Sequence, residues 1–411
     1  MELHPILESG QEPKSNLWYV ISSLNAPSPR VGQSCVFIHK THSINIIGGA
    51  DPSTTHDDIF RLDLLTQTWA KVDSDSFEER YEHCAYVPQS SPTHVFVFGG
   101  ANKQSNLNSI QLIITDSGKV ECSTVNCSGN APCPRTIHSA ASSGDFLYVW
   151  GGGEQGANPV MDQQLHVFNS NDNSWKQLIV SGKLPSPRHG HVMAVVGKIL
   201  YVHGGMSGAT FHKDMHAINL TELKCAKVKF RGDIPSSRAA HAACTYKNFI
   251  YLFGGMSADG ALDDMYQFNT RSSNWIKLKT DCPPPTPRLD HSMILAYLPH
   301  KKELKDFDSD GKTSAGIDEI IPVEDSEAPT LSDGDQKPSI VPLDEWGSGE
   351  GAGVVTAVEG QLSTLALSER NLPTTSDGSV DRDVPVCVVF GGMDASGNIF
   401  NDLLVLKIDE T

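Results

Sequence analysis

Residues 175–205 read WKQLIVSGKLPSPRHGHVMAVVGKILYVHGG. This stretch contains a tryptophan, an arginine with a histidine three residues later, an apolar run and a closing glycine pair. The same features recur along the chain at intervals of about 50 residues. The repeated positions are Arg30, Arg80, Arg135, Arg188, Arg238 and Arg288 for the arginine, Trp18, Trp69, Trp175 and Trp275 for the tryptophan, and the glycine pairs that begin at Gly48, Gly99, Gly151, Gly204, Gly254 and Gly391.

A sustained period of about 50 residues is typical of Kelch repeats, each of which forms one four-stranded blade of a β-propeller. The six copies identify the chain as a member of the Kelch family, and we expect an all-β, six-bladed Kelch β-propeller. In each repeat the arginine and histidine begin strand a, the apolar run before the glycines is strand b, an alternating stretch is strand c, and the tryptophan marks strand d. Because a single blade cannot bury its two faces, the six must close into one ring.

The first tryptophan precedes the first arginine, so the chain begins with a strand d, residues 17–21 (LWYVI). In two repeats the tryptophan stands 20 residues after the second glycine of the pair, and the same count from Gly392 passes the last residue, Thr411. The last blade therefore has no strand d of its own. We expect residues 17–21 to complete it, which closes the ring and removes an exposed sheet edge.

Two repeats lack the tryptophan. The same count of 20 residues leads to Val120 in the second repeat and to Cys225 in the fourth. Since both side chains are smaller than tryptophan, we expect the blade junctions at these positions to pack less tightly.

The last repeat contains an insertion. From Arg288 to Gly391 the chain takes 103 residues, where three of the other repeats take 16. The surplus, residues 299–384, has 19 acidic and 7 basic residues and few aromatics, a composition that predicts disorder. We therefore divide the chain into an N-terminal extension (1–16), the propeller (17–298), the acidic insertion (299–384) and the remainder of blade 6 (385–411).

Composition narrows the class of protein. The net charge of −17 disfavours sequence-independent binding of nucleic acid and direct docking on anionic lipid. The nine cysteines are scattered and form no C-x-x-C pair, which favours a reducing compartment. No apolar run reaches the length of about 18 residues that a membrane span requires, and the first residues do not resemble a signal peptide. We expect a monomeric cytoplasmic protein.

The recurring motif does not predict catalysis. A catalytic group is rarely needed once per blade, so we interpret the R-x-x-H positions, of which Gln33 is the exception, as structural residues that bond to loop carbonyls. Residues 151–156 (GGGEQG) match a dinucleotide-binding pattern but lead into a strand rather than a helix. Residues 306–317 begin like an EF-hand loop and lack the final glutamate. We predict no catalytic residue, no metal and no cofactor, and hence no enzyme.

A closer resemblance rests on the stretches LWYVI, RYEHCAYVP, LYVWGGGEQGANPVMD and PSPRHGHVM. Together they resemble the Kelch-repeat effectors of Rab GTPases. The resemblance implies a cytoplasmic protein that is peripheral on endosomal membranes, binds a GTP-bound late-endosomal Rab GTPase and supports vesicle transport from endosome to trans-Golgi network. Two alternatives stay open: an adaptor unrelated to Rab GTPases, such as a substrate-recognition subunit, and a propeller enzyme that uses the central channel.

The loops between strands b and c share one face of the ring with the loops between strand d and the next strand a, because successive strands alternate in direction. Partner-binding residues are disproportionately found on such loops. Our candidate contact residues are Asn102, Glu154, Asn158, Phe211, His212 and Phe400.

Overall fold

The computed structural model describes residues 4–22, 24–73, 76–115, 120–136, 139–154, 158–299 and 383–409, and the account below concerns these residues. Their regular elements are β-strands, apart from one short 3-10 helix, η1 (His39–Thr41). The predicted insertion, residues 299–384, lies almost entirely outside the described residues, and so does the EF-hand-like stretch.

Within these ranges the chain forms six antiparallel sheets of four principal strands, each corresponding to one sequence repeat. Blades 1 to 3 are composed as follows: β2 (Ser34–Ile38), β3 (Ser43–Ile47), β4 (Ile59–Asp63) and β5 (Thr68–Val72); β6 (Cys84–Tyr86), β7 (His94–Phe98), β8 (Ile110–Ile114) and β9 (Glu121–Val125); β11 (Ser139–Ser143), β12 (Phe146–Trp150), β13 (Leu165–Asn169) and β14 (Ser174–Leu178).

Blades 4 to 6 follow the same plan, and the first strands of all six blades contact one another in a closed circle. The predicted six-bladed propeller is thereby confirmed. Their strands are β16 (His189–Val196), β17 (Ile199–Ser207), β19 (Met215–Asn219) and β20 (Lys224–Lys227); β22 (Ala242–Tyr246), β23 (Phe249–Phe253), β26 (Met265–Asn269) and β27 (Asn274–Lys277); β28 (Ser292–Leu298), β29 (Val384–Phe390), β30 (Leu403–Lys407) and β1 (Trp18–Ile21).

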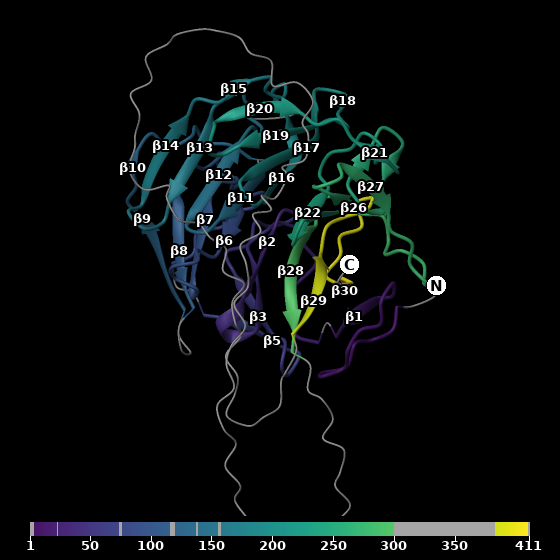
Figure 1. Cartoon of the computed structure of the whole chain (residues 1–411). Helices are drawn as coiled ribbons and strands as arrows, with labels where there is room; N and C mark the ends of the chain where they lie inside the picture. The colour runs from purple at the N-terminus through teal and green to yellow at the C-terminus, as the bar shows by residue number, and fades with distance from the viewer. Residues whose placement is uncertain are drawn as a thin grey trace, which may run out of the picture. The chain divides into compact units, whose positions relative to one another are not determined.

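Blade 6 is closed by the N-terminal strand, as predicted. Strand β1 pairs antiparallel with β30, with Trp18 opposite Leu406 and Ile21 opposite Leu403. Figure 1 shows β1 (purple) beside the C-terminal strands β29 and β30 (yellow). The first and last segments of the chain therefore complete one sheet.

The segment before β1 extends this closure. The backbone N–H of Leu7 donates to the carbonyl of Val20 at 2.9 Å, and the Leu7 side chain is buried in the core between blades 6 and 1. Ser9 Oγ donates to the carbonyl of Leu65 in blade 1 at 2.6 Å. The N-terminal segment thus bonds to two neighbouring blades.

Three short strands run parallel to the outer strand of the following blade: β10 (Ser128–Gly129) beside β14, β15 (Ser181–Gly182) beside β20, and β21 (Arg231–Gly232) beside β27. Each ends in a glycine six residues before the repeated arginine. At Gly182 φ is +91°, and an added Cβ would lie 2.2 Å from the carbonyl oxygen of Cys225. Only glycine allows the chain to pass this close to the neighbouring strand.

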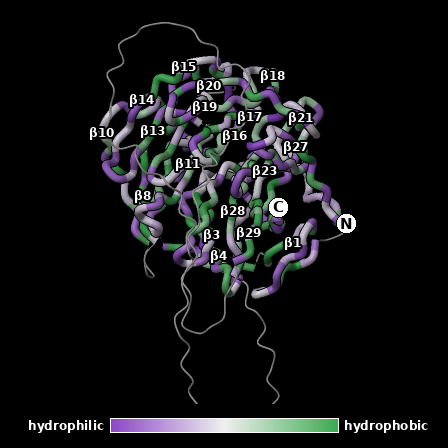
Figure 2. The backbone as a smooth tube through the Cα atoms, in the orientation of Figure 1, coloured by the Kyte–Doolittle hydropathy of each residue, from purple (hydrophilic) through white to green (hydrophobic). Residues whose placement is uncertain are grey.

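The hydrophobic core of the described residues consists of six clusters, one at each junction between neighbouring blades. The tube in Figure 2 shows hydrophobic residues concentrated in the strands. Each repeated tryptophan packs against the side chain that precedes the glycine pair of the blade before it. The ring centroids lie 5.4 Å apart for Trp18–Phe253, 6.1 Å for Trp69–Phe390, 4.9 Å for Trp175–Phe98 and 5.3 Å for Trp275–His203.

Of the two positions assigned to the missing tryptophans, the structure corrects one and confirms the other. In blade 2 the residue paired with Ile113, in the register that Trp69 has with Leu62, is Cys122 and not Val120. In blade 4 Cys225 does occupy the tryptophan position, opposite Ile218. Trp150 of blade 3 is fully buried in the same cluster.

The repeated arginines connect adjacent blades, and all six are at most 1% exposed. Arg188 Nη1 donates to the carbonyl of Gly204 at 2.9 Å and to Asp214 Oδ1 at 2.6 Å, both in its own blade. Its carbonyl accepts from the N–H of Gly152 in the preceding blade at 3.0 Å. Corresponding acidic partners of the other arginines are Asp58, Glu78, Asp162, Asp264 and Asp402.

The histidines three residues after the arginines also reach the preceding blade. His191 Nε2 lies 3.1 Å from the carbonyl oxygen of Trp150. Gln33, the exception in the sequence motif, donates from Nε2 to the carbonyl of Phe390 at 2.9 Å and so makes the equivalent contact between blades 1 and 6. Burial, reinforced by nearby arginine charge, lowers the pKa of His291 to about 3 and does the same for His203.

We expect acid to destabilise the fold through these histidines. An unfolded chain protonates histidine near pH 6.5, whereas the folded protein keeps His203 and His291 neutral to about pH 3. Between these values the unfolded state binds more protons, so the free energy of unfolding falls as pH is lowered, by up to about 1.4 kcal/mol per pH unit for each histidine. Urea unfolding monitored by tryptophan fluorescence at pH 7.5 and pH 5 measures the loss.

A matched variant separates this effect from general acid unfolding. His291→Gln reproduces the residue found at Gln33 and removes one of the titrating groups. It should lose less stability than the unaltered protein between pH 7.5 and pH 5. Equal losses in the two proteins would show that His291 is not kept neutral by the fold.

A second prediction concerns the short parallel strands. Gly182→Ala should lower the melting temperature more than Gly208→Ala, because both glycines have positive φ but an added Cβ at Gly208 meets no atom within 4 Å. The backbone conformation alone costs about 1–2 kcal/mol, and the collision with Cys225 should raise the loss at Gly182 to on the order of 3 kcal/mol. Calorimetric unfolding of both variants tests this, and equal losses would contradict it.

Candidate functional site

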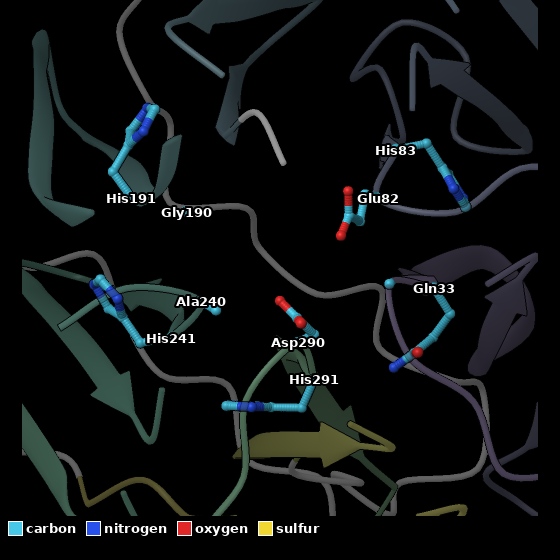
Figure 3. A pocket seen from close by; sticks show the side chains of 10 residues that line it. Gln33, Glu82, His83, Gly190, His191, Ala240, His241, Asp290 and His291 are labelled. Carbon is cyan, nitrogen blue, oxygen red and sulfur yellow. The ribbon is translucent and has the colours of Figure 1, made fainter. Parts of the chain in front are cut away.

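The residues two positions after five of the repeated arginines line the mouth of the central channel (Figure 3). Gly32, Glu82, Gly190, Ala240 and Asp290 all have left-handed backbone conformations, with φ between +53° and +63°. The N–H of Glu82 donates to the carbonyl of Gly32 at 2.6 Å, and Gly32 donates in turn to Asp290 at 3.1 Å. Asp290 donates to Ala240 at 3.1 Å and Ala240 to Gly190 at 2.7 Å, so the bonds run around the channel from blade to blade.

These residues line a cavity of about 130 Å³ together with Gln33, His83, His191, His241 and His291. In Figure 3 the histidine rings turn toward neighbouring blades, whereas the carboxylates of Glu82 and Asp290 face the opening. The Glu82 carboxylate accepts a hydrogen bond from the Thr136 hydroxyl. Burial raises the pKa of Asp290 to about 6. The mouth of the channel is therefore acidic at neutral pH.

One arrangement has the composition of a catalytic triad. His216 lies between Asp214, 3.1 Å from Nε2, and Cys225, whose Sγ is 4.0 Å from Nδ1. The Cys225 thiol is buried, and burial raises its pKa to about 12. His216 Nδ1 also lies 3.1 Å from the carbonyl oxygen of Lys183, and Asp214 is bonded to Arg188. A buried protonated thiol is a poor nucleophile, so this group belongs to the core.

The described residues contain no cluster of three or more His, Cys, Asp or Glu side chains that could hold a metal ion. Across the described part of the chain there is also no helix of the length and hydrophobicity needed to cross a membrane.

The candidate contact residues lie on four separate loops between strands b and c. Three of them shape these loops. Asn102 Oδ1 accepts from the backbone N–H groups of Gln104 and Ser105, each at 2.9 Å. His212 and Phe400 donate to the second glycine carbonyl of their own blades, at 2.8 and 2.9 Å. Their carbonyls accept from Arg238 and Arg30 of the following blades, and the Phe400 ring also lies 4.6 Å from the Arg288 guanidinium.

The other three candidates lie on loops of blades 3 and 4. Glu154 and Asn158 are exposed and close one loop of blade 3 through a backbone bond of 3.0 Å from Glu154 N–H to the Asn158 carbonyl. Phe211 is half-buried on β18 (Thr210–Phe211), which pairs with β17 in the corresponding loop of blade 4.

Two acidic residues of the channel mouth, Glu82 and Asp290, escaped the sequence analysis. They occupy the variable position between arginine and histidine, which is glycine, isoleucine or alanine in the other repeats. The aspartates that bind the arginines were also missed. They stand ten or eleven residues after the first glycine in five of the six pairs, a spacing that a comparison of the repeats would have revealed; in the second repeat Arg80 binds Glu78 instead.

Similar proteins were found in several vertebrates. Residues of this chain are 41% identical over 222 positions to a Bos taurus protein named "Rab9 effector protein with kelch motifs", covering 52% of this chain and 59% of the relative. Proteins of the same name from Danio rerio and Homo sapiens are 40% and 38% identical, over 233 and 222 positions; these cover 53% and 52% of this chain and 66% and 59% of the relatives. The chain thus spans less than two thirds of the length of these relatives.

The family model described as the KLHDC2/KLHL20/DRC7 Kelch-repeats domain matches residues 90–298, which is about half of the chain. This stretch contains blades 3, 4 and 5, most of blade 2 and the first strand of blade 6. The same period, arginines and glycine pairs continue through the blades on either side of it. By this match and its six-bladed architecture, the chain belongs to the Kelch-repeat family.

Proposed function

We propose that this protein is a non-enzymatic effector of a Rab GTPase and binds the GTP-bound form through the face of the propeller that carries the loops between strands b and c. The observation that carries the proposal is the similarity, at about 40% identity over half the chain, to proteins named Rab9 effectors. On this proposal the chain is a cytoplasmic monomer that reaches endosomal membranes through the GTPase and acts in vesicle transport from endosome to trans-Golgi network.

The geometry supports recognition rather than chemistry. The polar contacts of the channel mouth run between blades and fix the positions of the loops around it. A rigid array of loops can recognise a protein surface without paying much conformational entropy on binding. Rab-type switch regions are ordered by the γ-phosphate of GTP, so a surface of fixed shape would distinguish the two nucleotide states.

Within this face we assign two roles to the candidate residues. Glu154, Asn158 and Phe211 are the proposed direct contacts, because Glu154 and Asn158 are exposed and Phe211 is a half-buried aromatic side chain in the neighbouring loop. Asn102, His212 and Phe400 act by holding the shape of their loops.

The proposal predicts a nucleotide-dependent interaction. The full chain should bind Rab9 loaded with a non-hydrolysable GTP analogue at least tenfold more tightly than Rab9 loaded with GDP, as measured by isothermal titration calorimetry. Equal affinity for the two forms, or no binding to either, would exclude the effector function. In that case an adaptor with another protein partner becomes the better account.

Substitutions on the two faces of the propeller test which face binds the GTPase. Glu154→Ala combined with Phe211→Ala should weaken binding to the GTP form by about five- to thirtyfold, the loss of 1–2 kcal/mol expected for contact side chains. Lys198→Ala, on the exposed turn between β16 and β17 at the opposite end of blade 4, should leave affinity unchanged. Melting temperatures of both variants control for folding. The reverse pattern of losses would place the contact on the other face.

A further inference from the structure

Two cysteines from different blades lie in contact at the junction between blades 5 and 6. Cys244 is on β22 and Cys387 is on β29, and their Sγ atoms are 3.4 Å apart. Both belong to the apolar cluster that joins the two blades, with exposed fractions of 8% for Cys244 and 0% for Cys387. The two sulfur atoms are therefore already in contact across the junction.

A bond between these two cysteines would change how the C-terminal strands are attached to the ring. Strands β29 and β30 form the C-terminal hairpin, and residues 299–383 separate it in sequence from β28. The hairpin pairs with β28 on one side and with β1 on the other. These attachments are hydrogen bonds and packing, whereas a bond to Cys244 would join the hairpin covalently to blade 5.

We propose that Cys244 and Cys387 form a disulfide when the protein is exposed to a peroxide, and that this disulfide fastens the C-terminal hairpin into the closed ring. It is independent of the proposed Rab interaction and concerns a different part of the molecule.

The reaction balances with hydrogen peroxide as the oxidant. The Cys244 thiol loses its proton, and its thiolate, the more accessible of the two, attacks one peroxide oxygen. The O–O bond breaks, giving a sulfenic acid and a hydroxide ion that takes up the released proton and becomes water. Cys387 then attacks the Cys244 sulfur, the S–O bond breaks, and a second water leaves. In total two thiols and one peroxide give one disulfide and two waters.

The environment sets the rate of this reaction. Burial and the neighbouring thiol raise the pKa of Cys387 well above its ordinary value, so little thiolate exists at neutral pH and formation is slow. The same burial keeps reducing thiols away from the bond once it has formed. Oxidation should therefore be faster at pH 9 than at pH 7, and reduction should be slow without denaturant.

The test uses the full chain treated with hydrogen peroxide at pH 9, alkylated, and digested under non-reducing conditions. Mass spectrometry should find a linked pair of peptides containing Cys244 and Cys387, two hydrogens lighter than the sum of the free peptides. Cys244→Ala and Cys387→Ala should each abolish this species. The exposed Cys127 and Cys133 serve as internal controls that the oxidant has acted.

A second measurement follows the effect on the ring. Oxidation should raise the melting temperature of the unaltered chain by about 5 °C or more, and dithiothreitol in denaturant followed by refolding should reverse the rise. A chain with a protease site introduced between residues 302 and 380 should, after cleavage, keep its C-terminal fragment on a denaturing non-reducing gel only when oxidised. Oxidation of Cys127 and Cys133 while Cys244 and Cys387 remain alkylatable, or release of the fragment from oxidised protein, would overturn the proposal.

Discussion

A four-stranded blade with apolar side chains on both faces is stable only when a neighbour covers each face, and this constraint governs the whole molecule. Six blades satisfy it only by closing a ring, since an open row would leave two faces in water. The chain closes the ring by building its last blade from both ends: Trp18 and Ile21 on β1 pair with Leu406 and Leu403 on β30. Trp18 then fills the junction to blade 5, and Leu7, upstream of it, fills the junction to blade 1.

Similar polar contacts recur at several junctions of the described residues. Arg188 bonds by its side chain to its own blade and by its backbone to the blade before it. Gln33 and His191, each three residues after a repeated arginine, add a bond to the preceding blade. These contacts position the residues at the channel mouth, where Glu82 and Asp290 add negative charge to a face lined with loops. The stability of the ring and the arrangement of these loops thus depend on the same repeated positions.

Much of the fold could be predicted because the repeats show both the period and the positions at which a strand is missing or extra. The missing strand after Gly392 and the surplus strand around Trp18 are visible as spacing alone. The same counting misplaced one position, since blade 2 puts Cys122 and not Val120 at the tryptophan site. Counting assumes that turns keep their length, and the turn between β8 and β9 is two residues longer than its counterpart in blade 1.

The candidate site was less accessible to sequence reasoning. Asn102, His212 and Phe400 are candidate contact residues because the sequence places them in loops. The backbone contacts of these residues, however, recur at equivalent positions of other blades. The sequence does not reveal that Gly32, Glu82, Gly190, Ala240 and Asp290 share a left-handed backbone at the channel mouth, because glycine, alanine and acidic residues all occupy this position. Contacts such as that between Cys244 and Cys387 depend on which blades become neighbours, which only the closed ring determines.

Closure of the ring by β1 is tested most directly by comparing a chain that lacks residues 1–16 with one that lacks residues 1–21. Thermal unfolding and amide hydrogen exchange of β30 are measured for both. The shorter deletion keeps every pair between β1 and β30, so β30 should stay protected and the melting temperature should fall only modestly. The longer deletion removes Trp18, a loss of about 3–5 kcal/mol for its burial alone, and should expose β30 to exchange and lower the melting temperature much further. If the longer deletion melts at the temperature of the full chain with β30 still protected, the ring is not closed by the N-terminal strand.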